Sequence, residues 1–320
     1  MAVKKEQSEQ VTWISSQSLV RLRTDAGNIP LYTGKIHAKQ GGAYVSSFKG
    51  RGMEFDESRI YMPGDDIRNM DWRVTARTGE AHTKVYQEER ERPVLLWLDL
   101  NPSMFFATQG AYKSVIATKA ATLLAWCVAN HNDRVGALVF AGDEHIEIKP
   151  RRGKSAVLNF INRTVNHSAW NNGHWKNENR TNRNMEISMS RLRKVTHPGS
   201  LIFLISDFRE MNELSTSHLA NISRHNDIVL VHVYDPIESE LPTSGFYKVS
   251  DGTKEININA ADKTLREDYH QRFVEHTETL KTLCRQNRMH LINLATDNDV
   301  LESLQNGLGN QSPSQLLLKS

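Results

Sequence analysis

The sequence predicts an α/β protein with a doubly wound, mostly parallel sheet. From about residue 94 onward, short and wholly apolar runs alternate with longer segments of helical period. Runs of this kind are typical of strands that helices cover on both faces, and the helices supply the crossovers that parallel strands need. With 320 residues, of which 38% are hydrophobic and 24% charged, the chain is long enough to bury such a core.

Five apolar runs are the predicted strands. They are residues 94–98, 135–140, 201–205, 228–233 and 290–294. A helix is expected between the first two runs and another between the last two, because apolar residues recur there on one helical stripe. The stripes are Ile116, Ala120, Leu123, Leu124 and Cys127 in the first helix and Leu265, Tyr269, Phe273, His276, Leu280 and Leu283 in the second.

Two hairpins are expected beside this sheet. Residues 142–149 alternate polar and apolar side chains after a Gly-Asp turn, which predicts an antiparallel edge strand paired with the strand before it. Residues 245–258, with Asp251-Gly252 at their centre, predict a second hairpin outside the sheet.

The chain is predicted to have two parts and a tail. Residues 1–92 lack the alternation of apolar runs and helical segments. They contain a weakly predicted helix near residues 16–23, followed by a Gly-rich, polar segment, so we expect a smaller extended or β module there. Residues 93–310 form the α/β domain, and 311–320 are a tail. Within the domain, the Asn-rich stretch 166–184 is expected to be a long surface loop.

Charge and cysteine content exclude several classes of protein. The 40 basic and 37 acidic residues leave a net charge of +3, which gives no strong support to nucleic-acid binding. The two cysteines, Cys127 and Cys284, are too few for a disulfide framework or a four-cysteine zinc site. The first residues lack the apolar core of a signal peptide, and no run is long enough to span a membrane, so we expect a cytoplasmic protein without membrane insertion.

Polar residues follow two of the predicted strands. Asp99, Asn101 and Ser103 come after the first strand, and Asp207 comes after the third. In open α/β sheets ligands bind beyond the carboxyl ends of the strands, and clustered hard oxygens suit Mg²⁺ or Mn²⁺. The alternative is structural, because an Asp at a strand end is often a turn residue or a helix N-cap.

This pattern resembles the metal-ion-dependent adhesion site of the von Willebrand factor A domain, whose sheet is Rossmann-like. The resemblance rests on Asp99-x-Asn101-x-Ser103, a Thr181-Asn182 pair before a helix, and Ser206-Asp207. It implies Asp99, Asn101, Ser103, Thr181 and Asp207 as metal ligands. The family usually has Ser where this chain has Asn101, and we expect the longer amide to weaken the site.

A longer motif lies upstream, in the string GRGMEFDESRIYMPGDDIRNMDWRVTARTGE at residues 50–80. It is similar to the signature of the bacterial family called domain of unknown function 58, which precedes a von Willebrand A-like domain. The matching residues are Gly52, Glu54, Phe55, Arg59, Tyr61, Gly64, Asp65, Asp66, Arg68, Asp71, Trp72, Ala76 and Arg77. The resemblance extends over residues 50–300.

Two interpretations of this signature remain open. Pro63-Gly64 indicates a turn, and the Arg and Asp side chains around it can form charge-assisted pairs that stiffen a segment with little apolar content. The alternative is that these residues contact a partner or a catalytic metal directly.

The family resemblance implies a function in protein association. Members commonly accompany MoxR-type AAA+ ATPases, in pairs thought to act as chaperone-like systems on a client protein. We therefore expect a non-catalytic, Mg²⁺-dependent adaptor that binds an acidic residue of such an ATPase or of its client. The alternatives are a metal-dependent hydrolase using Asp99, Asp207 and Asp65 or Asp66, and, with less support, a nucleic-acid-binding protein that uses the basic segment 151–154.

Overall fold

The computed structural model describes residues 11–31, 53–88, 93–171, 184–250 and 255–309. The chain divides into two compact units, the larger one comprising Met1–Tyr32 with Arg92–Ser320 and the smaller one Thr33–Glu91. We expected residues 1–92 to form a single module. Residues 11–31 belong instead to the larger unit, because apolar side chains such as Ile14 and Leu19 are buried in its core.

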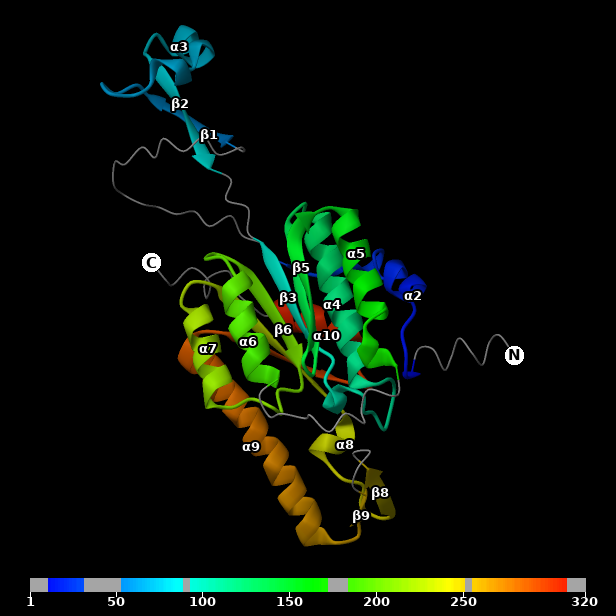
Figure 1. Ribbon diagram of the computed structural model, residues 1–320. Coiled ribbons are helices and arrows are strands. Elements are labelled where there is room, and N and C mark those ends of the chain that lie inside the picture. The colour runs from blue at the N-terminus through cyan, green and yellow to red at the C-terminus, as the bar shows by residue number, and fades with distance from the viewer. Residues whose placement is uncertain (1–10, 32–52, 89–92, 172–183, 251–254, 310–320) are drawn as a thin grey trace. The chain divides into compact units, whose positions relative to one another are not determined.

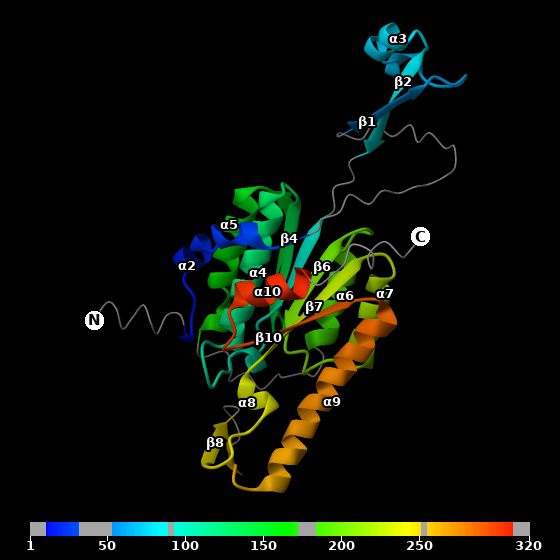
Figure 2. The same ribbon diagram turned by 180° about the vertical axis from the view of Figure 1, so that it is seen from behind.

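A six-stranded sheet forms the centre of the larger unit, in the order β10-β7-β6-β3-β4-β5 (Figures 1 and 2). Its strands are β3 (Val94–Asp99), β4 (Arg134–Ala141), β5 (Glu144–Arg152), β6 (Leu201–Ser206), β7 (Asp227–Tyr234) and β10 (His290–Ala295). Neighbouring strands are parallel except for the edge strand β5, which runs antiparallel to β4. The five predicted strands and the predicted edge hairpin are therefore confirmed.

The sheet changes winding direction between β3 and β6. These two strands are neighbours, with Val94 opposite Leu201 and Leu98 opposite Ile205. The chain leaves β3 towards β4 on one side, and it leaves β6 towards β7 on the other. The carboxyl ends of β3 and β6 therefore meet at the switch point of the sheet, where α/β proteins place their ligands.

Helices cover both faces of the sheet (Figures 1 and 2). Leu96 and Leu98 of β3 point to one face, and Leu95 and Trp97 point to the other. The first face packs against α2 (Ser16–Arg21), α4 (Lys113–Asn130), α5 (Lys154–Val165) and α10 (Val300–Gly309). The second packs against α6 (Asn184–Val195), α7 (Glu213–Ser223) and α9 (Lys263–Asn287).

Only the carboxyl-terminal half of α9 joins the core. The predicted apolar stripe begins at Leu265, but the buried residues of this helix are Leu280, Leu283 and Cys284. Its amino-terminal half extends past the sheet in both views. Among the helices of the described ranges, none has both the length and the hydropathy needed to cross a membrane.

Short elements complete the larger unit. The hairpin predicted at residues 245–258 is formed by β8 (Phe246–Ser250) and β9 (Glu255–Asn259), which pair antiparallel outside the main sheet. The remaining elements are α8 (Pro236–Ser239) and the 3-10 helices η1 (Asp25–Asn28), η3 (Pro102–Met104) and η4 (Ser168–Trp170). Most of the Asn-rich stretch, 172–183, lies outside the described residues, and α6 begins at Asn184.

The smaller unit is a β-hairpin with a helix. Strands β1 (Met53–Ile60) and β2 (His82–Glu88) pair antiparallel, with a bulge between Phe55 and Glu57. Between them lie η2 (Ile67–Asn69) and α3 (Trp72–Thr78). The expected small β module is therefore present, over a shorter stretch of chain than predicted.

Candidate functional site

Asp99 is a buried carboxylate at the end of β3. Its Oδ1 accepts a hydrogen bond from the backbone N–H of Asn101 at 2.8 Å. Its Oδ2 accepts from the hydroxyl of Ser206, at the end of β6, at 2.6 Å. Asp99 therefore joins the two strands at the switch point, and in the described part of the chain neither of its oxygens is bonded to a cationic side chain.

Ser103 and Asn101 place further polar atoms after β3. The Ser103 hydroxyl and the side-chain nitrogen of Asn101 are buried and have no hydrogen-bond partner among the described residues. The amide oxygen of Asn101 accepts from the backbone N–H of Gly142, in the β4–β5 turn, at 2.7 Å. An amide oxygen has two lone pairs, so one of them remains after the bond to Gly142.

Asp207 follows β6 and is bound to a buried lysine. Lys113 Nζ donates to Asp207 Oδ2 at 2.8 Å and to Glu238 Oε1 at 2.8 Å, and all three side chains are buried. The other oxygen of Asp207 accepts from the backbone N–H of Arg209 at 3.2 Å. The guanidinium of Arg209 lies 3.0 Å from Glu238 Oε1. Each carboxylate here therefore has a cationic partner, unlike Asp99.

The two aspartates at the switch point have opposite electrostatic environments. Burial, together with the negative charge of Asp207, raises the pKa of Asp99 to about 8. Burial also acts to raise the pKa of Asp207, but the Lys113 ammonium outweighs it and holds this pKa below its ordinary value. Asp207 is thus a carboxylate whose charge is balanced within the protein, whereas the charge of Asp99 has no such balance.

The backbone after Asp207 adopts an uncommon conformation. Phe208 has a φ of +55° in the left-handed region, which non-glycine residues with large side chains seldom occupy. In this conformation its N–H donates to the Ser206 hydroxyl at 2.9 Å, and its ring is buried in the core. Such backbone outliers concentrate at functional sites.

The donor set at the switch point suits a hydrated divalent cation with few protein ligands. The described residues contain no cluster of three or more His, Cys, Asp or Glu side chains able to hold a metal. Mg²⁺ needs fewer protein ligands, because it keeps several waters and takes one or two carboxylates. Asp99 offers a carboxylate oxygen and Ser103 a hydroxyl oxygen, and Asp207 lies at the same end of the sheet. Thr181, the remaining predicted ligand, lies outside the described residues.

The signature residues of the smaller unit form local bonds. Asp71 is buried, caps α3 through the N–H groups of Arg73 and Val74 at 3.1 Å, and accepts from the Ser58 hydroxyl at 2.8 Å. These bonds, the one from Ser58 most of all, lower the pKa of Asp71. We infer that Asp71 holds α3 on the hairpin.

The expected network of Arg and carboxylate side chains is reduced to one ion pair in the described part of this unit. Arg59 pairs with Asp65 at 2.7 Å, and Asp65 also accepts from the backbone N–H of Met62. Asp66 accepts from the N–H of Arg68 and caps η2. The side chains of Arg68, Trp72 and Arg77 are exposed, that of Tyr61 is half-buried, and that of Glu54 lies outside the description.

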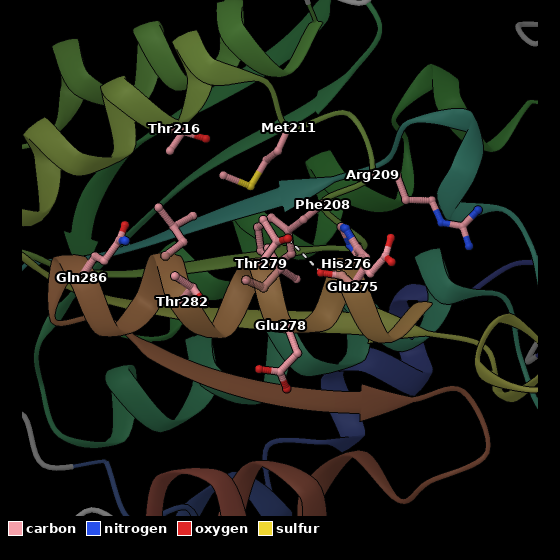
Figure 3. A pocket seen from close by; sticks show the side chains of 12 residues that line it. Phe208, Arg209, Met211, Thr216, Glu275, His276, Glu278, Thr279, Thr282 and Gln286 are labelled. Carbon is pink, nitrogen blue, oxygen red and sulfur yellow. Dashed lines mark hydrogen bonds between the residues drawn. The ribbon is translucent and has the colours of Figure 1, made fainter. Parts of the chain in front are cut away.

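A groove runs between α7 and α9 on one side of the switch point (Figure 3). Its volume is about 720 Å³. Its apolar lining residues include Phe208, Met211 and Leu280. Arg209 and His276 lie towards one end of it. His276 Nε2 donates to the carbonyl oxygen of Asp207 at 3.0 Å, which connects the groove to the aspartate.

Comparison with known proteins places the chain in a family. Residues 57–279 match the family described as "Protein of unknown function DUF58", and this match covers more than half of the chain. The chain belongs to the DUF58 family. The match includes the part of the smaller unit from Glu57 onward, the switch point and most of α9.

The chain is also similar to curated mycobacterial proteins and to a solved structure. The "Uncharacterized protein Mb1516" of Mycobacterium bovis and the "Uncharacterized protein Rv1480" of Mycobacterium tuberculosis are each 28% identical over 270 residues, covering 82% of this chain and 81% of the relative. The solved structure of the conserved hypothetical protein BatB from Bacteroides thetaiotaomicron is 15% identical, with a TM-score of 0.42, and covers 68% of this chain and 97% of that one.

Sequence reasoning missed three charged residues of this cluster: Lys113, which pairs with Asp207, and Glu238 and Arg209, which pair with each other. Lys113 is the first residue of a mostly buried helix, and nothing in the neighbouring sequence distinguishes it from an exposed lysine. The position of Glu238 could have been predicted from the sequence. It lies three residues after Asp235 in a segment that begins with Pro236, which is the spacing of a helix capping box. The structure contains that capping box at the start of α8.

Proposed function

We propose that this DUF58 protein is a non-catalytic adaptor that binds a partner protein in a Mg²⁺-dependent manner. In this proposal it works with a MoxR-type AAA+ ATPase in the chaperone-like assembly or maturation of a client. The observation that carries the proposal is the state of Asp99, a buried carboxylate at the switch point that has no cationic side chain bonded to it in the described residues.

The residues present favour a weakly held cation. Asp99 and the unpaired hydroxyl of Ser103 would hold it, with Asp207 and the remaining lone pair of Asn101 as further oxygens. A bound Mg²⁺ would offer an open coordination position to a carboxylate of the partner. Because Lys113 already balances much of the charge of Asp207, the protein itself would supply little net negative charge, which favours an additional anionic ligand from outside.

The hydrolase alternative has less support from the described residues. Asp65 and Asp66 belong to the smaller unit, where one pairs with Arg59 and the other caps η2. The Ser206 hydroxyl, a candidate nucleophile beside Asp99, is buried, and its bonds are to Asp99 and to the backbone of Phe208. A general base within reach of a nucleophile is what hydrolysis would need, and the hydrogen bonds of Ser206 include no imidazole.

Binding of a purified MoxR-type ATPase to the full chain tests this proposal. In Mg²⁺-containing buffer we expect the parent to bind and Asp99→Asn to bind at least tenfold more weakly. The matched control is Asp143→Asn, because Asp143 is an exposed carboxylate in the β4–β5 turn beside Gly142 and is not among the proposed ligands. Equal binding by the parent, Asp99→Asn and Asp143→Asn would contradict the proposal, and circular dichroism would verify that each variant is folded.

A further inference from the structure

A second cavity lies next to the groove of Figure 3 and shares Arg209 and His276 with it. It has a volume of about 330 Å³, at the lower end of small-molecule sites. Its lining consists of Arg209, Arg272, His232, His276, Tyr269 and Phe273, with Glu238 as its acidic residue. Four of these residues lie on one face of α9, at positions 269, 272, 273 and 276, where the helix extends past the core.

The cavity has an excess of positive charge. Glu238 is held by Lys113 at 2.8 Å and by Arg209 at 3.0 Å, and its other oxygen accepts from the backbone N–H of Asp235. Lys113 and Arg209 together balance Glu238 and Asp207. Arg272 adds a further positive charge to the lining, and its exposed side chain forms no ion pair within the described residues.

No acidic side chain in the described part of α9 forms an ion pair with Arg272. Glu275 accepts a hydrogen bond from the side chain of Gln271 at 3.0 Å. The ion pairs that the described part of α9 does form join other residues: Lys263 with Glu267, and both Lys281 and Arg285 with Glu278. A guanidinium of this kind presents several donors in a fixed plane, which match the oxygens of a carboxylate or a phosphate.

Aromatic side chains form an apolar wall of the same cavity. Tyr269 and Phe273 are one helical turn apart on α9 and are both half-buried. The Phe273 ring lies 6.1 Å from the ring of His232, centroid to centroid, and 5.2 Å from that of Tyr234. The cavity therefore combines a cationic mouth with an apolar wall, which fits a ligand that has an anionic group on a small body.

We propose that this cavity binds a ligand through an oxyanion, a carboxylate or a phosphate, with Arg272 as its main partner and Arg209, shared with Glu238, as a second. The shared chemistry can come from an acidic side chain of a protein or from a phosphorylated small molecule. Its proposed donors are guanidinium groups, whereas the proposed cation site consists of oxygens. His276 lines the cavity and donates a hydrogen bond to the backbone carbonyl of Asp207.

Calorimetric titration of the full chain in EDTA tests the proposal without any metal. The probes are inorganic phosphate and a blocked glutamate, acetyl-Glu-amide, each compared with NaCl of equal ionic strength. We expect saturable binding of at least one probe. Saturation by phosphate alone would assign a phosphorylated ligand, and saturation by the glutamate alone would assign an acidic side chain. The absence of saturable binding of both probes would overturn the proposal.

Variants of two exposed arginines locate the binding. Arg272→Gln keeps a good helix former at a position outside the core, so the fold should persist, and we expect at least a fivefold loss of affinity. Arg163→Gln is the matched control, since Arg163 is exposed on α5, which packs against the other face of the sheet. Equal loss in both variants, or full affinity in Arg272→Gln, would overturn the assignment. Asp99→Asn should leave this affinity unchanged, which separates this site from the proposed cation site.

Discussion

Lys113 Nζ lies 2.8 Å from Asp207 Oδ2, and both side chains are buried. The same ammonium also binds Glu238, so one buried cation links the amino-terminal end of α4 to the loops after β6 and β7. Pairs of this kind add little net stability compared with apolar residues, but removing one partner leaves a buried charge without compensation. Lys113 is therefore the residue on which the arrangement of Asp207 depends.

Replacing Lys113 is expected to destabilise the larger unit strongly. Lys113→Met should lower the free energy of unfolding by about 3–5 kcal/mol, because Asp207 and Glu238 would lose their shared partner. Denaturant titration followed by circular dichroism measures this loss. Lys154→Met, at an exposed position in the first turn of α5, is the matched control and should change stability by less than about 0.5 kcal/mol.

A double-mutant cycle distinguishes a true pair from two independent sites. Lys113→Met combined with Asp207→Asn should cost clearly less than the sum of the two single changes, because the second change removes the unpaired charge that the first created. Additive losses would contradict the pairing.

The buried histidine His232 predicts acid sensitivity. Burial, with the neighbouring His276 as the second cause, lowers the pKa of His232 from 6.5 to about 4. The unfolded chain therefore binds a proton below pH 6.5 that the folded protein does not. This contribution to stability is present above pH 6.5 and is lost as the pH falls towards 4, by roughly 3 kcal/mol.

Substitution of His232 tests this pH dependence. His232→Phe places a ring of similar size among Phe208, Tyr234 and Phe273, and it should flatten the fall in stability between pH 7 and pH 4. Denaturant midpoints measured across this range provide the comparison. His225→Gln, at an exposed position, should keep the pH profile of the parent, and a profile unchanged by His232→Phe would show that other groups cause the acid sensitivity.

Two adjacent residues in the smaller unit are predicted to have different roles. Asp71 is 8% exposed and caps α3, whereas Trp72 is 66% exposed. Asp71→Ala should cost about 1–2 kcal/mol in local stability, seen as faster amide exchange in α3 and β2, because the cap and the bond to Ser58 are both lost. Trp72→Ala should leave exchange unchanged. If Asp71→Ala preserved exchange rates but lost ATPase binding, the structural role would be wrong.

Substitutions of Asn101 test its place at the proposed cation site. Asn101→Asp keeps an acceptor for the N–H of Gly142 and adds a charge, so Mg²⁺ affinity should rise by about tenfold or less. Asn101→Ser shortens the side chain and leaves that N–H without its partner, which should cost about 1 kcal/mol of stability. Calorimetry and denaturant titration measure the two effects. Parental behaviour in both variants would place Asn101 outside the site and show that its bond to Gly142 adds little.

The fold could be predicted from the sequence because its strands are continuous apolar runs. Runs such as 94–98 and 201–205 are apolar throughout, and strands of that kind are buried on both faces. The division of the chain was less accessible. Ile14 and Leu19 pack into the core of the larger unit although the sequence around them is polar. Their burial depends on contacts with residues that are distant in the sequence. Apolar residues recur with helical period along the whole of α9, but only its carboxyl-terminal part is buried. Periodicity does not reveal where a helix extends beyond the core.

The candidate site was predictable only where position in the sheet determines it. Asp99 and Asp207 follow apolar strands, so the general rule for ligand sites placed them at one edge. The bond from Asn101 to Gly142 depends on how the β4–β5 turn sits beside η3, and no local pattern encodes it. Lys113 was hidden because lysines are nearly always exposed, and its burial requires two carboxylates from distant loops.

Calorimetric titration of Mg²⁺ into the metal-free full chain tests the central claim most directly. At pH 7 the raised pKa of Asp99, about 8, means that cation binding should release about one proton, which shows as a dependence of the binding heat on the ionisation enthalpy of the buffer. We predict saturable binding with this proton release in the parent and in Asp143→Asn, and loss of both in folded Asp99→Asn. Absence of Mg²⁺ binding in the parent, or identical binding in Asp99→Asn, would contradict the account.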